Sequence, residues 1–395
     1  METLIIDWAT AMVRWFHVIA GIAWIGSSFF FIFLDASLRK ESWQIDGVSG
    51  ESWLVHGGGF YKVEKYMVAP ERMPAVLHWF KWEAYSTWIS GMALLVVLYY
   101  VSAGVYLIDP GVAAITPMTA TVIGVGSLVF GWIVYDLLCR ALNDHEDWLA
   151  IGGGVLLALV AIGYTQVFGG RGAFIHVGAL VGTIMVANVL LVIIPNQRKV
   201  VADLIAGRAP DPALGKQAKQ RSVHNNYLTL PVVFTMISNH FAMVTGHPYN
   251  WAFLIGIGVV GGLIRHWFNV KHRTGRRLDW VWAVAAASVA AMVAFSAWRP
   301  DRVPNTGMQT ATLAEVHAIA QARCTSCHSA APTDEGFADA PAGMMFDTPD
   351  QLYAARDKVF SQVATGIMPP GNLTGLTDQE RAAVIGWYEA GASAE

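Results

Sequence analysis

Long stretches without charged side chains alternate with short polar connections along the first 300 residues. A helix rises about 1.5 Å per residue, so roughly 20 apolar residues span a bilayer. Six stretches are long and uncharged: Trp15–Leu34, Ala84–Ile108, Gly111–Tyr135, Trp148–Gly170, Gly172–Ile194 and Trp280–Trp298. Two weaker stretches complete the set. Residues 222–250 are polar but uncharged, and residues 250–269 are interrupted by the charged Arg265. The pattern predicts an all-α membrane bundle of eight transmembrane helices over residues 1–299.

Composition and charge agree with a lipid environment and set the orientation. Of the 395 residues only 14% are charged, against about a quarter in soluble proteins. The connections 39–83, 139–147, 195–223 and 265–279 hold 18 Lys and Arg, and the opposite side of the bundle holds 4. The positive-inside rule then places both termini outside the cytoplasm, on the periplasmic side of a bacterial inner membrane. No part of the chain is basic enough to indicate a nucleic-acid partner.

A small domain follows the last apolar stretch. Residues 298–307 are rich in proline, glycine and polar side chains, which is typical of a linker, so we predict a linker over 300–312 and a domain over 313–395. The domain should contain three short helices. Thr348 and Pro349 begin the middle one, and Thr377 with Glu380 forms a capping box that begins the last.

This domain carries a Cys-x-x-Cys-His motif. Cys324 and Cys327 are spaced to bond covalently to the vinyl groups of one haem, and His328 is placed as the first axial ligand of its iron. Zinc fits less well, because a second pair of ligands is missing. Met368, in a segment stiffened by two following prolines, is the expected sixth ligand. Its rivals, Met344 and Met345, are otherwise explained by packing against the porphyrin.

Polar residues inside the predicted bundle form an outer and an inner cluster, and each such residue is a functional hypothesis. The outer cluster consists of His17, His176 and His240. Two of them facing each other would hold a haem b. Packed or hydrogen-bonded histidines explain the same pattern equally well.

The inner cluster combines cations, amides, a hydroxyl and imidazoles. On one predicted helical face, His78, Lys81, Trp82 and Tyr85 recur at helical spacing. The remaining members are Glu83, His224, Asn225, Asn226, Thr229 and His266. Such groups around a cavity suit a small, planar, anionic heterocycle. Polar contacts between helices, a snorkelling lysine and an interfacial ion pair are the competing explanations.

The connection 39–77 is long for a loop without a function. Its glycine-rich run, Val55–Tyr61, either presents backbone N–H groups to an anion or forms a hairpin turn. We favour the turn. Asp136 is interpreted as an interface residue, and Cys139 as redox-inactive.

Four segments together carry a family resemblance. They are the first-helix sequence from Arg14 through His17 to Phe30, the Val55–Tyr61 run, the segment His78–Glu83 and the segment His224–Pro231. With the cytochrome tail they resemble the membrane-bound cytochrome c urate oxidases, also called urate hydroxylases. The first-helix sequence alone is also similar to short membrane proteins that bind haem b and oxidise protoporphyrinogen. The tail itself resembles a small class I cytochrome c.

The resemblance implies that urate is oxidised to 5-hydroxyisourate with oxygen from water. Electrons would pass through one covalent haem c to a downstream cytochrome or terminal oxidase. Two electrons leave urate and a haem accepts one, so a haem b or a stabilised urate radical is needed. His78 or His224 is the expected general base; with a site in the outer cluster, His17 and His240 would take catalytic roles.

Two other functions fit the same pattern. One is a quinol- or porphyrinogen-oxidising membrane dehydrogenase with the same cytochrome output. The other is not enzymatic: a copper or anion transporter whose cytochrome acts as a sensor.

Overall fold

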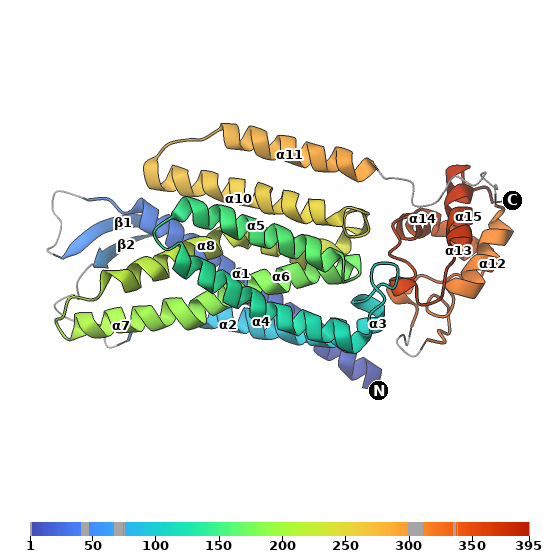
Figure 1. The fold of residues 1–395 in the computed structure, drawn as a ribbon, viewed down its shortest axis with the longest axis horizontal. Helices are drawn as coiled ribbons and strands as arrows, with labels where there is room; N and C mark the ends of the chain where they lie inside the picture. The colour runs from blue at the N-terminus through green and yellow to red at the C-terminus, as the bar shows by residue number, and fades with distance from the viewer. Residues whose placement is uncertain are drawn as a thin grey trace.

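The computed structural model is an elongated helical molecule with a β-hairpin at one end of a helix bundle and a small helical domain at the other (Figure 1). It describes residues 2–40, 47–66, 74, 76–298, 311–334, 337 and 339–394. The helices of the bundle are α1 (Glu2–Ser37), α2 (Trp82–Leu95), α3 (Ala103–Tyr106), α4 (Pro117–Ala141), α5 (Glu146–Thr165), α6 (Gly170–Ala187), α7 (Ile194–Ile205), α8 (Pro212–Ile237), α9 (Ala242–Thr245), α10 (Asn250–Thr274) and α11 (Trp280–Ala297). Turns of π-helix, Val96–Tyr100 and Asn188–Ile193, follow α2 and α6.

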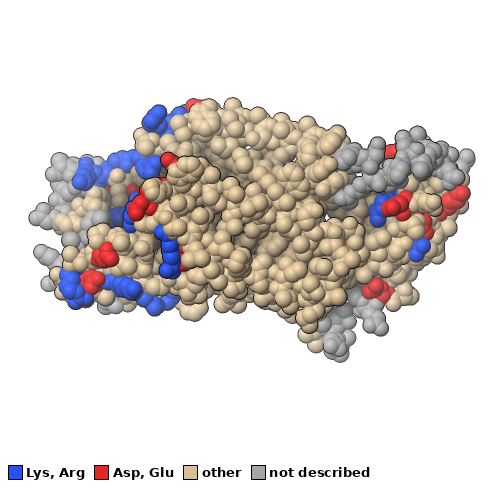
Figure 2. Space-filling model, in the orientation of Figure 1, with Lys and Arg blue, Asp and Glu red and all other residues tan. Residues whose placement is uncertain are grey.

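Within the described ranges, six helices are long and apolar enough to cross a membrane. They are Trp8–Ser37, Pro117–Ala141, Glu146–Thr165, Gly170–Ile205, Asn250–Thr274 and Trp280–Ala297. Many large apolar side chains on α4 and α5 are exposed, as lipid-facing residues would be. Figure 2 shows a band without charged residues around the middle of the molecule and a concentration of Lys and Arg at the end that carries the hairpin.

The two other predicted spans differ from expectation. The stretch 84–108 is interrupted, because the backbone leaves α2 through the π-turn and Ser102 has a non-helical ψ of 42° before α3 begins. The stretch 222–250 belongs to α8, which begins earlier, at Pro212, where the Asp211 carboxylate accepts a hydrogen bond from the Ala213 N–H. After Ile237 the chain continues as a 3₁₀ turn and the short α9.

The prediction that His78 shares a helical face with Lys81 is wrong. Lys81 has a non-helical φ of −136°, so α2 begins only at Trp82 and the regular spacing of a helix does not extend back to His78. His78 instead lies in the irregular segment that leads into the helix.

The glycine run forms a hairpin turn, as favoured. Strands β1 (Val48–His56) and β2 (Gly59–Tyr66) pair in antiparallel fashion, with His56 opposite Gly59. Gly57 and Gly58 have φ values of 59° and 79°, the positive values that a two-residue turn of this kind requires. The all-α prediction therefore missed one two-stranded sheet, whose strands have no long apolar run to reveal them.

The bundle packs around α6, which contacts α2, α4, α5 and α8. Its fully buried Leu180 fits against Gly131 of α4, where an added Cβ would approach the leucine to 2.6 Å. Close approach of helices at glycine is how membrane bundles gain packing contacts. This core fixes the positions of the polar side chains that α6 and its π-turn carry.

In the part of the C-terminal domain that the structure describes there are four α-helices where three were predicted: α12 (Leu313–Arg323), α13 (Pro349–Ala354), α14 (Arg356–Ala364) and α15 (Asp378–Glu389). The expected middle helix is divided at Ala355. Thr348 caps α13, and Thr377 with Glu380 forms the predicted capping box of α15. Buried Val316, Leu352 and Trp387 form the core. Of the predicted linker 300–312, all but 311–312 lies outside the described residues.

Candidate functional site

The Cys-x-x-Cys-His motif forms a tight turn directly after α12. The His328 backbone N–H donates to the Cys324 carbonyl at 2.8 Å, and both cysteines are free thiols. The His328 Nδ1 donates to the Met344 carbonyl at 3.0 Å. A histidine ligand is usually oriented in this way, with the other ring nitrogen left for the metal. Burial raises the pKa of the Cys324 thiol to about 11, so the thiol is protonated at neutral pH. The donor set of two thiols and one oriented imidazole fits a covalent haem.

The three candidate methionines lie in different surroundings. Met344 is partly buried against the core of the tail, and Met345 is 36% exposed. Met368 lies in a loop that is fixed through its backbone. Its N–H donates to the Gln362 carbonyl at 3.1 Å, and its carbonyl accepts from Arg381 at 3.3 Å. Met368 remains the predicted sixth ligand.

The Met368 loop rests on the end of the bundle opposite the hairpin (Figure 1). Gly371 lies against α3, where an added Cβ would be 3.0 Å from the Gly104 carbonyl oxygen. At Gly246 an added Cβ would be 2.6 Å from the Thr365 carbonyl oxygen, and Arg171 of α6 donates to Gln362 at 3.4 Å. A cavity of about 80 Å³ lies between the two parts. The tail is therefore docked on the bundle through the loop that carries Met368.

A row of aromatic rings leads from this junction into the bundle. Tyr106 ends α3, the short helix against which Gly371 of the tail packs. Its ring centroid is 6.3 Å from that of Tyr99, which in turn lies 6.5 Å from the ring of His176. These rings lead from the docked tail to the core of the bundle.

The outer histidines have different neighbours in the structure. His17 Nδ1 lies 3.0 Å from both the Thr87 carbonyl oxygen and the Ser90 hydroxyl on α2. His176 is fully buried; its Nδ1 bonds to the Gly172 carbonyl and its Nε2 to the Tyr100 hydroxyl. His240 is exposed. Because both ring nitrogens of His176 have protein partners, it fits the packed, hydrogen-bonded interpretation best.

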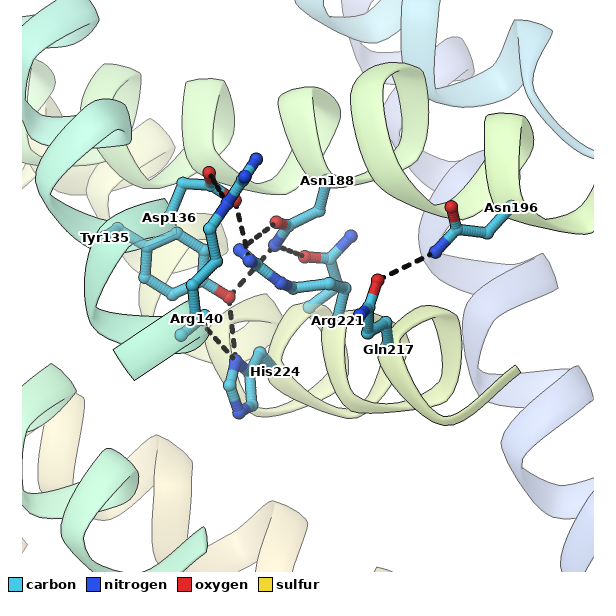
Figure 3. A network of polar contacts seen from close by, with 10 residues as sticks. Tyr135, Asp136, Arg140, Asn188, Asn196, Gln217, Arg221 and His224 are labelled. Carbon is cyan, nitrogen blue, oxygen red and sulfur yellow. Dashed lines mark hydrogen bonds and ion pairs between the residues drawn. The ribbon is translucent and has the colours of Figure 1, made fainter. Parts of the chain in front are cut away.

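A polar network joins α4, α8 and the π-turn after α6 (Figure 3). Arg221 pairs with Asp136 at 2.7 Å and donates to the Asn188 side chain at 3.1 Å. Asn188 donates to the Tyr135 hydroxyl and to Asn225. The Tyr135 hydroxyl lies 2.7 Å from His224 Nδ1. Five of these six side chains are buried and His224 is partly buried.

A second polar group lies between α1, α8 and α10. The Asn226 side-chain oxygen accepts from Arg265 at 3.2 Å and from Asn269 at 3.0 Å. The Arg265 guanidinium stacks on the Phe29 ring at 3.9 Å. Thr229, a predicted ligand group, instead donates to the Asn225 carbonyl within its own helix.

The remaining inner residues are scattered. His78 is 71% exposed and lies 4.0 Å from Glu83, whose second carboxylate oxygen is buried without a hydrogen-bond partner. The Lys81 ammonium lies 5.9 Å from the Trp82 ring. The exposed His266 bonds through Nδ1 to the Tyr227 hydroxyl at 3.0 Å. The structure thus places His224 and Asn225 in the network with α4 and the π-turn, and Asn226 in the separate group with α10. His78, Lys81 and His266 lie outside both groups.

Several central residues were not predicted. Arg221, Tyr135 and Asn188 link the network, and Arg265 anchors the second group. Asn188 and Arg265 each interrupt an apolar run. Polar residues in a bilayer are costly, so these interruptions were a signal in the sequence that could have identified both residues.

Comparison with known families gives one match. Residues 3–296 match the family model described as "Urate oxidase N-terminal". No curated protein and no solved structure matches the chain. The match covers the bundle and ends before the linker.

Proposed function

Because the chain belongs to the urate oxidase N-terminal family, we propose that it is a membrane oxidoreductase that oxidises urate to 5-hydroxyisourate. The reaction takes its oxygen from water: urate and one water give the product, two protons and two electrons. The electrons leave for a downstream cytochrome or terminal oxidase. The observation that carries the proposal is the joining of a urate oxidase-family bundle to a Cys-x-x-Cys-His tail that docks on it through the Met368 loop.

The proposal includes eight membrane spans, with the interrupted α2–α3 segment and the polar α8 as the two additional ones. A helix interrupted by π-turns is tolerated in lipid where neighbouring helices cover it, and the buried Tyr99 lies on this π-turn. The concentration of Lys and Arg at the hairpin end (Figure 2) supports a cytoplasmic position for that end. The tail then lies on the periplasmic side of a bacterial inner membrane.

Cys324, Cys327, His328 and Met368 would hold the haem c. Bound there, the haem supplies one-electron transfer. The row of rings from Tyr106 at the docked tail to Tyr99 and His176 supports electron exit at this junction. For a haem b, His17 fits a ligand role better than His176, whose ring nitrogens are both engaged.

On the substrate side, His224 is the base that the surroundings favour. In the tautomer whose Nδ1–H donates to the Tyr135 hydroxyl oxygen, Nε2 carries no proton and is the atom that can take one from urate or water. His78 is mostly exposed and outside α2, which disfavours a precise role in proton transfer. Asn226 and Lys81 are the groups that would bind and orient an anion.

Isotope labelling tests the reaction. The purified protein is supplied anaerobically with urate and oxidised soluble cytochrome c in ¹⁸O-labelled water. The proposal predicts 5-hydroxyisourate that carries ¹⁸O and two reduced cytochromes per urate. A product without the label, or reduction only by a quinol or a porphyrinogen, would favour another dehydrogenase.

A further inference from the structure

Two arginines buried in the bundle differ in how their charge is balanced. Arg221 is 4% exposed and pairs with the Asp136 carboxylate at 2.7 Å. Arg265 is 6% exposed, but its acceptors are neutral: the side-chain oxygens of Asn226 at 3.2 Å and Asn269 at 3.4 Å. Across the described ranges, no carboxylate forms an ion pair with Arg265. A buried cation without a counter-ion is costly, and such a residue in a membrane segment indicates function.

The side chain beside Arg265 also has an unused donor. Asn226 is fully buried, and its Nδ2 has no hydrogen-bond partner. The hydrogen-bond partners determine which end of the Asn226 amide is oxygen. The Arg265 guanidinium and the Asn269 side-chain NH₂ both donate to that end, so it must be the acceptor. The nitrogen therefore remains the free group. A buried donor without an acceptor costs about 1–3 kcal/mol in general, so an acceptor is expected here.

The position of the guanidinium is set by packing. The centroid of the Phe29 ring lies 3.9 Å from the central carbon of the Arg265 guanidinium, so α1 covers one side of the charged group. A planar guanidinium offers parallel N–H donors that match two neighbouring acceptor atoms of a planar anion. The three helices thus supply a cation, a free amide donor and an aromatic ring against the cation.

We propose that Arg265 and Asn226 bind an oxyanion, and that this anion is urate; the identity of the anion rests on the proposed function. Urate is a planar anion at neutral pH with adjacent oxygen and nitrogen acceptors. It would neutralise Arg265 and accept from Asn226 Nδ2. A porphyrin propionate presents the same oxyanion chemistry, and the experiment below separates the two sources.

The test measures urate binding to the full-length holoprotein by anaerobic equilibrium dialysis with radiolabelled urate. Arg265→Gln should weaken binding by about tenfold or more, the effect of losing a charged hydrogen-bond partner. Arg265→Lys keeps the charge but not the planar donors, so it should recover part of the affinity. Arg273→Gln is the matched control: it removes one exposed positive charge from the last turn of the same helix and should bind urate as the wild type does. Reduction of the haem c by ascorbate verifies that each variant is folded.

The outcomes distinguish this inference from the proposed function. Wild-type protein that oxidises urate, together with an Arg265→Gln variant that binds urate with unchanged affinity, would overturn the inference alone. Loss of b-type haem from Arg265→Gln, with urate binding unchanged, would assign the site to a propionate and also overturn it. Wild-type protein that neither binds nor oxidises urate would overturn the urate assignment and the proposed function together.

Discussion

Removing the carboxylate of Asp136 tests whether the buried polar network has the energetics that its geometry implies. In Asp136→Asn, Arg221 would lose its 2.7 Å ion pair and keep only neutral acceptors, the new amide oxygen and the Asn188 oxygen at 3.1 Å. Breaking a buried pair from one side costs about 3–5 kcal/mol, because the remaining charge stays buried. Arg140 also pairs with Asp136, but its side chain is 72% exposed, so its loss adds at most about 1 kcal/mol.

The assay is reversible unfolding in mixed detergent micelles, with the free energy of unfolding compared between variants. Arg140→Gln is the control and should lower that free energy by less than about 1 kcal/mol. The double variant Asp136→Leu with Arg221→Met should be far less destabilised than Asp136→Asn, because neither charge remains. A loss below about 1 kcal/mol for Asp136→Asn would refute the reasoning, since Arg221 would then be solvated or paired in some other way.

Three further predictions concern the tail and its junction. Met368→Ala should abolish the weak near-infrared band of a methionine–iron bond; if the band survives in the absorbance spectrum, another methionine is the ligand. The hydrogen bond from the Thr377 N–H lowers the pKa of the Glu380 carboxyl. The stabilisation of the tail by this hydrogen bond is therefore complete above the unfolded glutamate pKa of about 4.3 and is lost as pH falls through the lower folded pKa. Thermal unfolding of Glu380→Gln should lack this acid dependence, and an unchanged dependence would contradict the role of Glu380. Tyr106→Leu should slow haem reduction by urate in stopped-flow measurements while reduction by ascorbate is unaffected, whereas equal rates with urate would remove Tyr106 from the electron path.

Much of the helical framework was predictable, because apolar length and glycine turns are local signals. Five of the six clear apolar stretches correspond to long helices, one of them being α6 together with the π-turn and α7 that continue it. The weaker stretch that contains Arg265 corresponds to the long helix α10. The hairpin turn at Gly57 followed from its sequence. The early start of α8 at Pro212 was missed because its first turns are polar, so hydropathy could not mark them.

The candidate site was less predictable, because its contacts join distant segments. The ion pair between Asp136 and Arg221 spans 85 positions of sequence, and nothing local indicates it. His78 looked helical by spacing, but the backbone at Lys81 places it before the helix. The cysteine motif is the opposite case, since its residues are adjacent in sequence and their arrangement is set by one turn.

Anaerobic addition of urate to the purified, fully oxidised protein tests the central claim most directly. The absorbance of reduced c-type haem is followed with no other reductant present. The account predicts that urate alone reduces the haem bound to Cys324 and Cys327, with up to two haems reduced per urate consumed. A haem that stays oxidised with urate but is reduced by ascorbate would contradict it.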